Sequence, residues 1–346
     1  MHHQVVCHVN GPKAVKLKSP VNIDQKHNKI FDKIEYLTRD QGIYYLNNIN
    51  VTDRGIVFSG LRKFDKAIIN DNVHKKYSLT YLVKVMLSYK RNRFKDDKNY
   101  LLVFDPWAAV NYYHWVIDTL PRLLIIKNYL ADSVLLLPRN AKKYMYESVS
   151  YFEPGETYEF SKHSYAAIPN LFIASPLVDS FLHDGEALLL LRKYIIDRIN
   201  EKILKLPEAE YNNKIYISRN NQQYRKIVNE NEVCQVLNGY GFKIVSFEGM
   251  SFDEQVSLMM NAKYVVSSHG ANLTNILFMP RGGKVLEFNR DTSPVLCFWS
   301  LASSIDLDYY YQLCPIFGSR NPSDNNADLY VNIEELQANI ENMMSS

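Results

Sequence analysis

Apolar and polar residues alternate regularly in the second half of the chain. Short runs rich in β-branched and aromatic residues predict buried strands, and the segments after them have the apolar spacing of amphipathic helices. The strand-like runs are residues 213–219, 243–248, 263–268 and 284–288. This alternation of strand and helix predicts βαβ units and a parallel sheet that is covered on both faces.

Two of the expected helices in this half carry start signals. Asn229 and Glu232 have the N-cap and N3 spacing of a capping box, and Ser251 and Glu254 have the same spacing. Gly239 predicts the end of the first of these helices.

The first half shows a looser form of the same alternation. Residues 1–70 predict short strands separated by Asn- and Gly-rich turns. Helices are expected over residues 74–94, 112–130 and 185–204, and buried strands over 101–106, 133–138 and 170–177.

The chain has 346 residues, enough for two domains at roughly 150 residues each. The polar stretch 206–213 is the expected linker. We therefore expect a β-rich segment over 1–70 that belongs to the first domain, and an α/β domain over 71–205. A second α/β domain is expected over 206–315, followed by a C-terminal tail and helix over 316–346 that packs back on the first domain.

Composition narrows the class of protein. The chain is 47% hydrophobic and 22% charged, which is typical of a globular protein, and its 40 Lys and Arg against 37 Asp and Glu give no reason to expect nucleic acid as a partner. The four cysteines are scattered without a CxxC pair, so neither a zinc site nor a disulfide framework is expected. No secretory signal and no apolar run of roughly 20 residues is visible. We expect a cytoplasmic protein, and peripheral attachment to a membrane through a basic face is compatible with this.

The segment after the strand 263–268 has the features of a phosphate site. Ligands of open α/β sheets bind at the carboxyl ends of strands, where the next helix begins. Gly270 permits a tight turn and close approach of a ligand, and the helix start that follows offers unpaired N–H groups. Ser268 and Thr274 add hydroxyl donors. An ordinary capped helix with His269 in the turn is the alternative, and the pattern alone favours it.

Charged residues are expected at the same sheet edge. Arg219 ends the strand before it and Arg225 lies in the following loop, so both could neutralise a diphosphate. Glu248 and Glu287 end two further strands, where carboxylates often accept hydrogen bonds from ribose hydroxyls. Solvated loop arginines and helix-capping carboxylates are the alternatives.

His114 and Asp118 are the candidate acid–base pair of the first half. They are four residues apart, so on a helix they share a face and can touch. A histidine oriented by a carboxylate is suited to act as a general base, and Asp118 could also act as the base itself. A half-buried pair that braces the start of a helix is the alternative that this pattern favours on its own.

Metal motifs are absent from the sequence. There is no HExxH, and the one DxD, Asp306-Leu307-Asp308, lies in a segment that reads as a strand with both carboxylates on one face. P-loop and GxSxG motifs are also absent. We expect neither a metal ion nor a cofactor.

Three ordered segments together resemble glycosyltransferase family 61. They are H-W-x-x-D-x-L-P-R at 114–122, the R…R…N-E signals that begin at Arg219, and S-H-G-A-x-L-T-N-x-x-F-M-P at 268–280. The resemblance covers roughly residues 100–290. It implies an α/β fold of GT-B architecture, with two Rossmann-like domains and a cleft between them. It also implies a nucleotide-sugar donor (usually a UDP-sugar), inversion at the anomeric carbon, and no bound metal.

The resemblance assigns roles to the candidate residues. The donor diphosphate would be bound by Arg219, Arg225, Ser268, His269, Gly270, Ala271, Leu273 and Thr274. Glu248 or Glu287 would hold the ribose or the donor sugar, and His114 or Asp118 would take the proton of the acceptor hydroxyl. The acceptor side would be formed by Tyr112, Tyr113, Trp115 and Arg122.

The resemblance favours a bacterial-style enzyme that builds a surface polysaccharide, such as capsule, O-antigen or lipopolysaccharide, in the cytoplasm or at the inner membrane. Its partners would be the nucleotide sugar and a glycan or lipid-linked glycan acceptor. The oligomeric state stays open. Two other functions are compatible with the sequence, namely an inactive GT-B protein that binds carbohydrate and a UDP-sugar epimerase.

Overall fold

The chain divides into two compact units, which are described separately. In the computed structural model, the described residues are 3–95, 97–203, 213–319, 321 and 324–345. Unit 1 comprises Met1–Ala14 and Leu37–Ala187, and unit 2 comprises Val15–Tyr36 and Leu188–Ser346. The expected linker over 206–213 lies, except for its last residue, outside the described residues.

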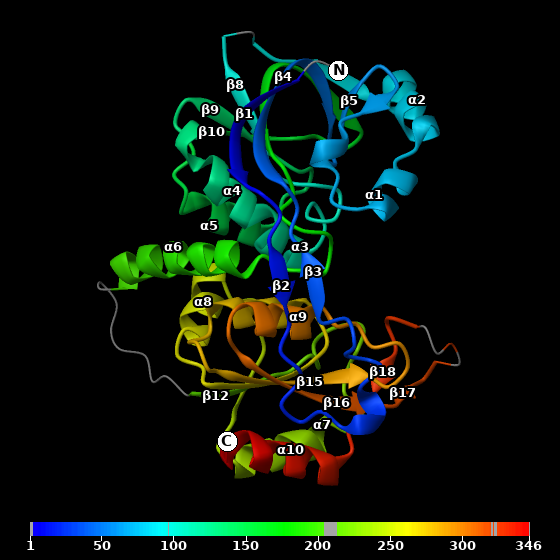
Figure 1. The fold of residues 1–346 in the computed structure, drawn as a ribbon, viewed down its shortest axis with the longest axis vertical. Coiled ribbons are helices and arrows are strands. Elements are labelled where there is room, and N and C mark those ends of the chain that lie inside the picture. The colour runs from blue at the N-terminus through cyan, green and yellow to red at the C-terminus, as the bar shows by residue number, and fades with distance from the viewer. Residues whose placement is uncertain (1–2, 96, 204–212, 320, 322–323, 346) are drawn as a thin grey trace. The chain divides into compact units, whose positions relative to one another are not determined.

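Unit 2 is built on a five-stranded sheet with the order β13-β12-β14-β15-β16 (Figure 1). Its strands are β12 (Lys214–Ile217), β13 (Lys243–Val245), β14 (Tyr264–Ser268), β15 (Lys284–Arg290) and β16 (Asp308–Cys314). All neighbours pair in parallel, which confirms the parallel sheet expected from the apolar runs. Counted along the chain the order is 2-1-3-4-5, so the chain reverses its direction of winding between β12 and β14, where doubly wound sheets bind their ligands.

Helices cover both faces of this sheet. They are α7 (Glu230–Gly239), α8 (Phe252–Met259), α9 (Cys297–Ser304), α10 (Ile333–Ser345) and the 3₁₀ helix η5 (Ala271–Phe278). Figure 1 shows α7 and α10 on one face of the sheet and α8 and α9 on the other. The smaller elements of the unit are η1 (Gln25–His27), β17 (Ile316–Phe317) and β18 (Asp328–Leu329).

One of the two expected capping boxes is confirmed. At the start of α8, the Glu254 N–H donates to Ser251 Oγ at 3.2 Å, and the Ser251 N–H donates to the Glu254 carboxylate at 2.7 Å. The box expected at Asn229 is wrong, because its side chain pairs instead with the backbone of Val331 at 2.9 and 3.0 Å.

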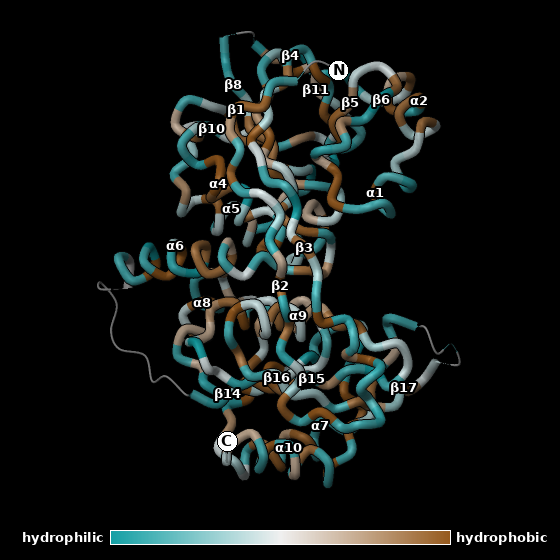
Figure 2. The backbone as a smooth tube through the Cα atoms, in the orientation of Figure 1, coloured by the Kyte–Doolittle hydropathy of each residue, from teal (hydrophilic) through white to brown (hydrophobic). Residues whose placement is uncertain are grey.

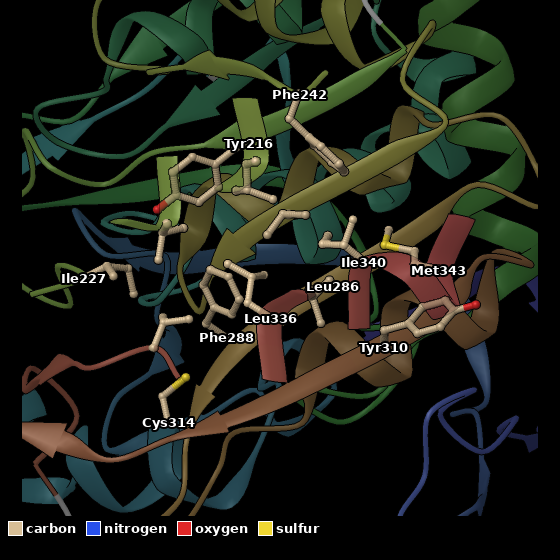
Figure 3. Packing of buried hydrophobic residues seen from close by; sticks show 14 of the residues in the cluster. Tyr216, Ile227, Phe242, Leu286, Phe288, Tyr310, Cys314, Leu336, Ile340 and Met343 are labelled. Carbon is tan, nitrogen blue, oxygen red and sulfur yellow. The ribbon is translucent and has the colours of Figure 1, made fainter. Parts of the chain in front are cut away.

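The core of unit 2 includes the C-terminal helix. Figure 3 shows Phe288 and Tyr310 of the sheet packed with Leu336 and Ile340 of α10, and all four are fully buried. The expectation that residues 316–346 pack back on the first domain is therefore corrected. The apolar face of α10 completes the hydrophobic core of unit 2.

The N-terminal segment Val15–Tyr36 also belongs to unit 2, although residues 1–70 were expected in the first domain. Phe31 packs edge-on against Trp299 with ring centroids 5.1 Å apart, and against Tyr311 at 4.8 Å. The indole N–H of Trp299 donates to the backbone oxygen of Lys18 at 2.7 Å. The segment enters and leaves through the paired strands β2 (Ala14–Lys16) and β3 (Glu35–Leu37).

Unit 1 is built on a nine-stranded mixed sheet. Its strands are β1 (His3–Asn10), β4 (Gln41–Thr52), β5 (Val57–Ser59), β6 (Arg62–Lys63), β7 (Lys90–Arg93), β8 (Asn99–Leu102), β9 (Ser133–Leu137), β10 (Glu156–Glu159) and β11 (Ser164–Ala174). The block β10-β9-β8-β11 is parallel, and β4 pairs antiparallel with β11. Counted from β8 the parallel order is 3-2-1-4, which places a second reversal of winding between β8 and β11.

The helices of unit 1 differ from expectation in one region. The unit contains η2 (Asp65–Ala67), α1 (Asp71–Lys76), α2 (Leu79–Ser88), α3 (Tyr112–His114), the π-helical turn η3 (Trp115–Thr119), α4 (Leu120–Ile126), η4 (Lys127–Tyr129) and α5 (Lys143–Ser150), and α6 (Gly185–Ile203) begins in it. The single helix expected over 74–94 is wrong. Ser78 adopts an extended backbone that separates α1 from α2, and the basic end of the segment forms β7.

No helix among the described residues is both long and apolar enough to span a bilayer.

Candidate active site

The first candidate cluster lies in unit 1, at the reversal between β8 and β11. His114 ends α3, and Asp118 lies in the π-helical turn that follows it. His114 Nδ1 and Asp118 Oδ2 are 2.7 Å apart, and both side chains are buried. The contact expected from the four-residue spacing is therefore confirmed. Short π-helical turns occur frequently at functional sites, because they redirect side chains within a helix.

Two further charged side chains, Asp105 and Arg122, act on this pair. Burial raises the pKa of Asp118, and the hydrogen bond from His114 opposes that rise. Arg122 is 1% exposed, and its Nε donates to the Ala174 oxygen at the end of β11 at 2.8 Å. Burial lowers the pKa of Arg122 to about 10, while the nearby charges of Asp105 and Asp118 act in the opposite direction. The charges of Asp105 and Arg122 thus act on Asp118, the hydrogen-bond partner of His114.

Aromatic rings enclose His114. The ring centroids of Trp107, Tyr113 and Phe181 lie 4.9, 5.0 and 5.7 Å from that of His114. Phe181 is 42% exposed and has a φ of +68°, an uncommon backbone conformation for a bulky residue. Strained backbone of this kind often occurs at functional sites. Phe181 is thus an exposed aromatic ring held next to the His114 side chain.

The residues expected on the acceptor side have different environments. Tyr112 is half-buried and packs edge-on against Tyr144 at 4.9 Å. Tyr113 is buried, and its hydroxyl lies 2.8 Å from His183 Nε2. Trp115 is fully buried, and its indole N–H donates to Ser148 Oγ at 2.9 Å. Trp115 and Arg122 are thus buried in the interior of unit 1, and Arg122 Nη1 and Nη2 have no hydrogen-bond partner among the described residues.

The second candidate cluster lies in unit 2, at the reversal between β12 and β14. Arg219 follows β12, is 8% exposed, and lies so close to Gly270 that a Cβ there would come 2.1 Å from Nη1. Burial lowers the pKa of Arg219 to about 10, and the positive charge of Arg225 contributes. Burial also lowers the pKa of Arg225, and Arg290 at the end of β15 adds to that effect. The structure therefore gathers three arginines, and none of them forms an ion pair with a described residue.

Several buried donors at this edge lack a hydrogen-bond partner among the described residues. They are Arg219 Nε, Arg225 Nε, Asn272 Nδ2, Thr274 Oγ1 and Arg290 Nη1. Each unsatisfied buried polar group costs about 1–3 kcal/mol, so such groups are normally few and isolated. Their concentration after three neighbouring strands favours a site for a ligand that is rich in acceptor oxygens and negative charge.

Glu287, which the sequence suggested as a ligand of the ribose or donor sugar, contacts His269 and Tyr309 in the structure. It is fully buried, its Oε1 lies 2.5 Å from His269 Nδ1, and its Oε2 accepts from the Tyr309 hydroxyl at 2.6 Å. With both oxygens engaged, Glu287 orients His269 and leaves the imidazole Nε2 for another partner. Glu248 is exposed, bonds the Ser246 hydroxyl, and exerts its charge on Arg219.

The remaining residues of the expected diphosphate site form its frame. Ser268 Oγ donates to the Arg225 backbone oxygen at 3.4 Å and so contacts the arginine loop. Ala271 is half-buried at the start of η5, and Leu273 is fully buried below it. The expected helix after Gly270 is present, but it is a 3₁₀ helix.

Asp306 and Asp308 do not share a strand face as expected. Asp306 lies before β16 with a φ of +64° and forms an ion pair with Lys18 at 2.5 Å, while Asp308 begins the strand.

Some residues of the two clusters were not singled out by the sequence. Asp105 follows the buried strand β8 and Arg290 ends the buried strand β15, which is the same kind of position that identified Arg219, so that signal could have found them. No local pattern marks Phe181, because its proximity to His114 brings together two segments that are distant in the sequence. Trp107 is near His114 in the sequence, but it lies in an irregular turn, where no periodic spacing predicts a contact.

Similarity to known proteins centres on the region that carries both clusters. The family model described as Glycosyltransferase 61 matches residues 112–286. The EGF domain-specific O-linked N-acetylglucosamine transferase of Xenopus laevis is 28% identical over 144 residues, which are 40% of this chain and 27% of that protein. The human protein O-linked-mannose beta-1,4-N-acetylglucosaminyltransferase 2 is 31% identical over 112 residues, 31% of this chain and 19% of the relative. The matched region thus spans about a quarter or less of these relatives.

Proposed function

The chain belongs to the glycosyltransferase 61 family, and we propose that it transfers a sugar from a nucleotide-sugar donor, most simply a UDP-sugar, to a hydroxyl group of a glycan with inversion at the anomeric carbon. The observation that carries this proposal is the arginine cluster of unit 2. Three arginines that form no ion pair with a described residue favour the binding of an anion, and a nucleoside diphosphate supplies two phosphate groups.

The arginines would act most strongly as the donor breaks. When the bond between the anomeric carbon and the diphosphate oxygen is cleaved, negative charge develops on the leaving UDP. Arg219 and Arg225 would stabilise that charge, and Arg290 would add to it. Such fixed cations can do the work that a bound divalent metal does in other transferases, so we propose catalysis without a metal. His269, oriented by Glu287 through Nδ1, would present its Nε2 to the donor.

The acceptor hydroxyl would be activated in unit 1. His114, held by Asp118, or Asp118 itself, would remove the hydroxyl proton as the oxygen attacks the anomeric carbon opposite the leaving group. Phe181 and Trp107 would supply an aromatic surface for the acceptor sugar.

The family and the strand orders also support proposals for the architecture, the donor and the biological role. The 3-2-1-4 and 2-1-3-4-5 parallel orders support a GT-B enzyme, with an acceptor domain and a donor domain. The matched relatives are named as N-acetylglucosamine transferases, so UDP-N-acetylglucosamine is the first donor to test. Glu248, at the rim beside Arg219, is proposed to bind the ribose or donor sugar. Synthesis of a surface polysaccharide on the cytoplasmic side of a membrane completes the proposal.

Nucleotide-sugar binding and turnover test this function. Wild type, Arg225→Ala and Asp118→Asn would be titrated with UDP-, GDP-, CMP- and dTDP-sugars by calorimetry, with and without EDTA, and slow hydrolysis would be followed. The exposed Lys243→Ala in the same unit is the matched control. We expect one nucleotide sugar to bind in EDTA, Arg225→Ala to lose that binding, and Asp118→Asn to retain it without turnover.

Three outcomes would contradict the proposal. Binding of no nucleotide sugar would remove the donor site. Interconversion of a UDP-sugar in the absence of an acceptor would identify an epimerase. Binding of a glycan together with failure to bind any donor would identify an inactive carbohydrate-binding protein.

A further inference from the structure

Helix α2 presents an apolar stripe to solvent. Four apolar side chains of this helix are exposed: Leu79 (54%), Val83 (38%), Met86 (38%) and Leu87 (81%). Their spacing places them within one arc of roughly 100° on the helix surface. The opposite side of α2 is already buried, because Leu82 and Val85 are fully enclosed in the core of unit 1. The exposed stripe is therefore additional to the face that folding requires.

The stripe continues onto a neighbouring turn. Leu61, between β5 and β6, is 48% exposed. Leu61 and Leu79 line one shallow hollow of the surface together with three cations, Arg62, Lys63 and Lys75, and one carboxylate, Asp65. Figure 2 shows the hydrophobic colouring of α2 beside the hydrophilic β6. Exposed leucines and cations thus meet at one place.

The surrounding sequence is strongly basic. Seven exposed cations occur between residues 71 and 95, against a single acidic residue that the sequence has there, Asp71. These cations are Lys75, Lys76, Lys84, Lys90, Arg91, Arg93 and Lys95. Arg91 and Arg93, on β7, line a separate hollow beside β4 and β11. None of the seven cations forms an ion pair with a residue that the structure describes. The whole chain carries a formal charge of only +3, so the excess is local.

We propose that this surface, called here the α2 face (Leu61, Leu79, Val83, Met86 and Leu87 with Arg62, Lys63, Lys75 and Lys84), binds the anionic head-group layer of a membrane. Apolar side chains that enter the interface, flanked by Lys and Arg near lipid phosphates, are the two requirements for peripheral binding of an amphipathic helix. A second copy of the chain is disfavoured, since a symmetric contact would bring the same cations together. The inference stands apart from the proposed catalysis, because lipid binding needs neither donor nor acceptor.

Vesicle sedimentation tests this surface. The full chain would be mixed with vesicles of phosphatidylcholine alone, or of phosphatidylcholine and phosphatidylglycerol in equal parts, at low and high salt. We expect binding to the anionic vesicles that weakens with salt. The variant Met86→Ser/Leu87→Ser should bind at least about ten-fold more weakly, because each buried apolar side chain contributes favourable transfer energy. Lys75→Glu/Lys84→Glu should lose the preference for anionic vesicles.

The controls separate membrane binding from self-association and from loss of folding. Leu190→Ser removes another exposed leucine (62%), which lies on α6, and should bind like the wild type. Circular dichroism and nucleotide binding would show that each variant is folded. The proposal is overturned by absence of binding to anionic vesicles, by equal binding to neutral ones, or by variants that bind like wild type. It is also overturned by a dimer, seen in light scattering, that Met86→Ser/Leu87→Ser dissociates, because the α2 face would then be a protein interface.

Discussion

The guanidinium of Arg219 lies directly against Gly270, where a Cβ atom would come 2.1 Å from Nη1 and 2.7 Å from Cζ. The φ of Gly270 is 168°, an extended conformation that any residue can adopt, so the backbone itself does not require glycine. Gly270→Ala should therefore displace the Arg219 side chain without straining the chain. We expect nucleotide-sugar affinity to fall about ten-fold, which corresponds to about 1.4 kcal/mol, with little change in melting temperature. Isothermal calorimetry measures the affinity.

Gly239 provides the matched control for this variant. An added Cβ at Gly239, in the last turn of α7, meets nothing within 4 Å. Gly239→Ala should keep the affinity of the wild type. If Gly270→Ala also kept it, the observed position of Arg219 would be irrelevant to donor binding.

Arg225 should be needed for the ligand rather than for folding. Burial and the charge of Arg290 lower its pKa, so its protonated form is held at a cost until an anion arrives. Arg225→Ala should leave the melting temperature of the free protein unchanged or slightly higher. UDP at 100 times its dissociation constant should stabilise the wild type by about 2.7 kcal/mol and the variant by far less. Thermal scans with and without UDP measure these melting temperatures. The expectation would be refuted if the ligand-free variant had a much lower melting temperature than the wild type and UDP still raised it.

Loss of the acid–base pair should abolish turnover and spare donor binding. His114→Gln and Asp118→Asn should each lower kcat by about 10²–10⁴, the usual contribution of general base catalysis. The affinity for the donor should stay within about two-fold, because the arginine cluster belongs to unit 2. The larger loss identifies the base: His114 if His114→Gln is the more damaging, Asp118 if the order is reversed. Steady-state kinetics measure kcat of both variants. If kcat were unchanged in both, the pair would have no part in catalysis.

The strands of unit 2 could be predicted from the sequence because buried parallel strands are continuous apolar runs. The runs at 213–219 and 263–268 correspond to β12 and β14 within two residues at each end. The placement of α10 could not be predicted in the same way. Its apolar periodicity shows that one face is buried, but the partner of that face is chosen by the tertiary structure.

The contacts of the candidate site are of two kinds: those set by local geometry could be predicted from the sequence, and those set by the tertiary structure could not. The contact of His114 with Asp118 depends on local helical geometry, so spacing alone predicts it. The role of Glu287 depends on its neighbours in space, His269 beyond β14 and Tyr309 on β16, which the sequence does not specify. The roles assigned to all these residues stay predictions until the variants are measured.

His183 should give the protein a marked sensitivity to acid. It is fully buried, and burial lowers its pKa from the ordinary 6.5 to about 3, so the native state keeps it neutral beside the Tyr113 hydroxyl. The unfolded chain takes up a proton as pH falls below about 6.5, whereas the native state does so only near pH 3. The free energy of unfolding should therefore fall with decreasing pH across that window, by up to about 1.4 kcal/mol per pH unit. The raised pKa of Asp118 acts in the opposite direction, since a native state that binds a proton more tightly is stabilised as pH falls through that pKa.

Comparing the pH dependence of the unfolding free energy between wild type and a His183 variant isolates the contribution of His183. His183→Gln keeps a group that can bond Tyr113 and cannot titrate, so its unfolding free energy should depend less on pH than that of the wild type. Urea denaturation curves between neutral pH and about pH 4 give the slopes. Parallel slopes for wild type and His183→Gln would mean that this histidine takes up its proton in the folded protein as readily as in the unfolded chain.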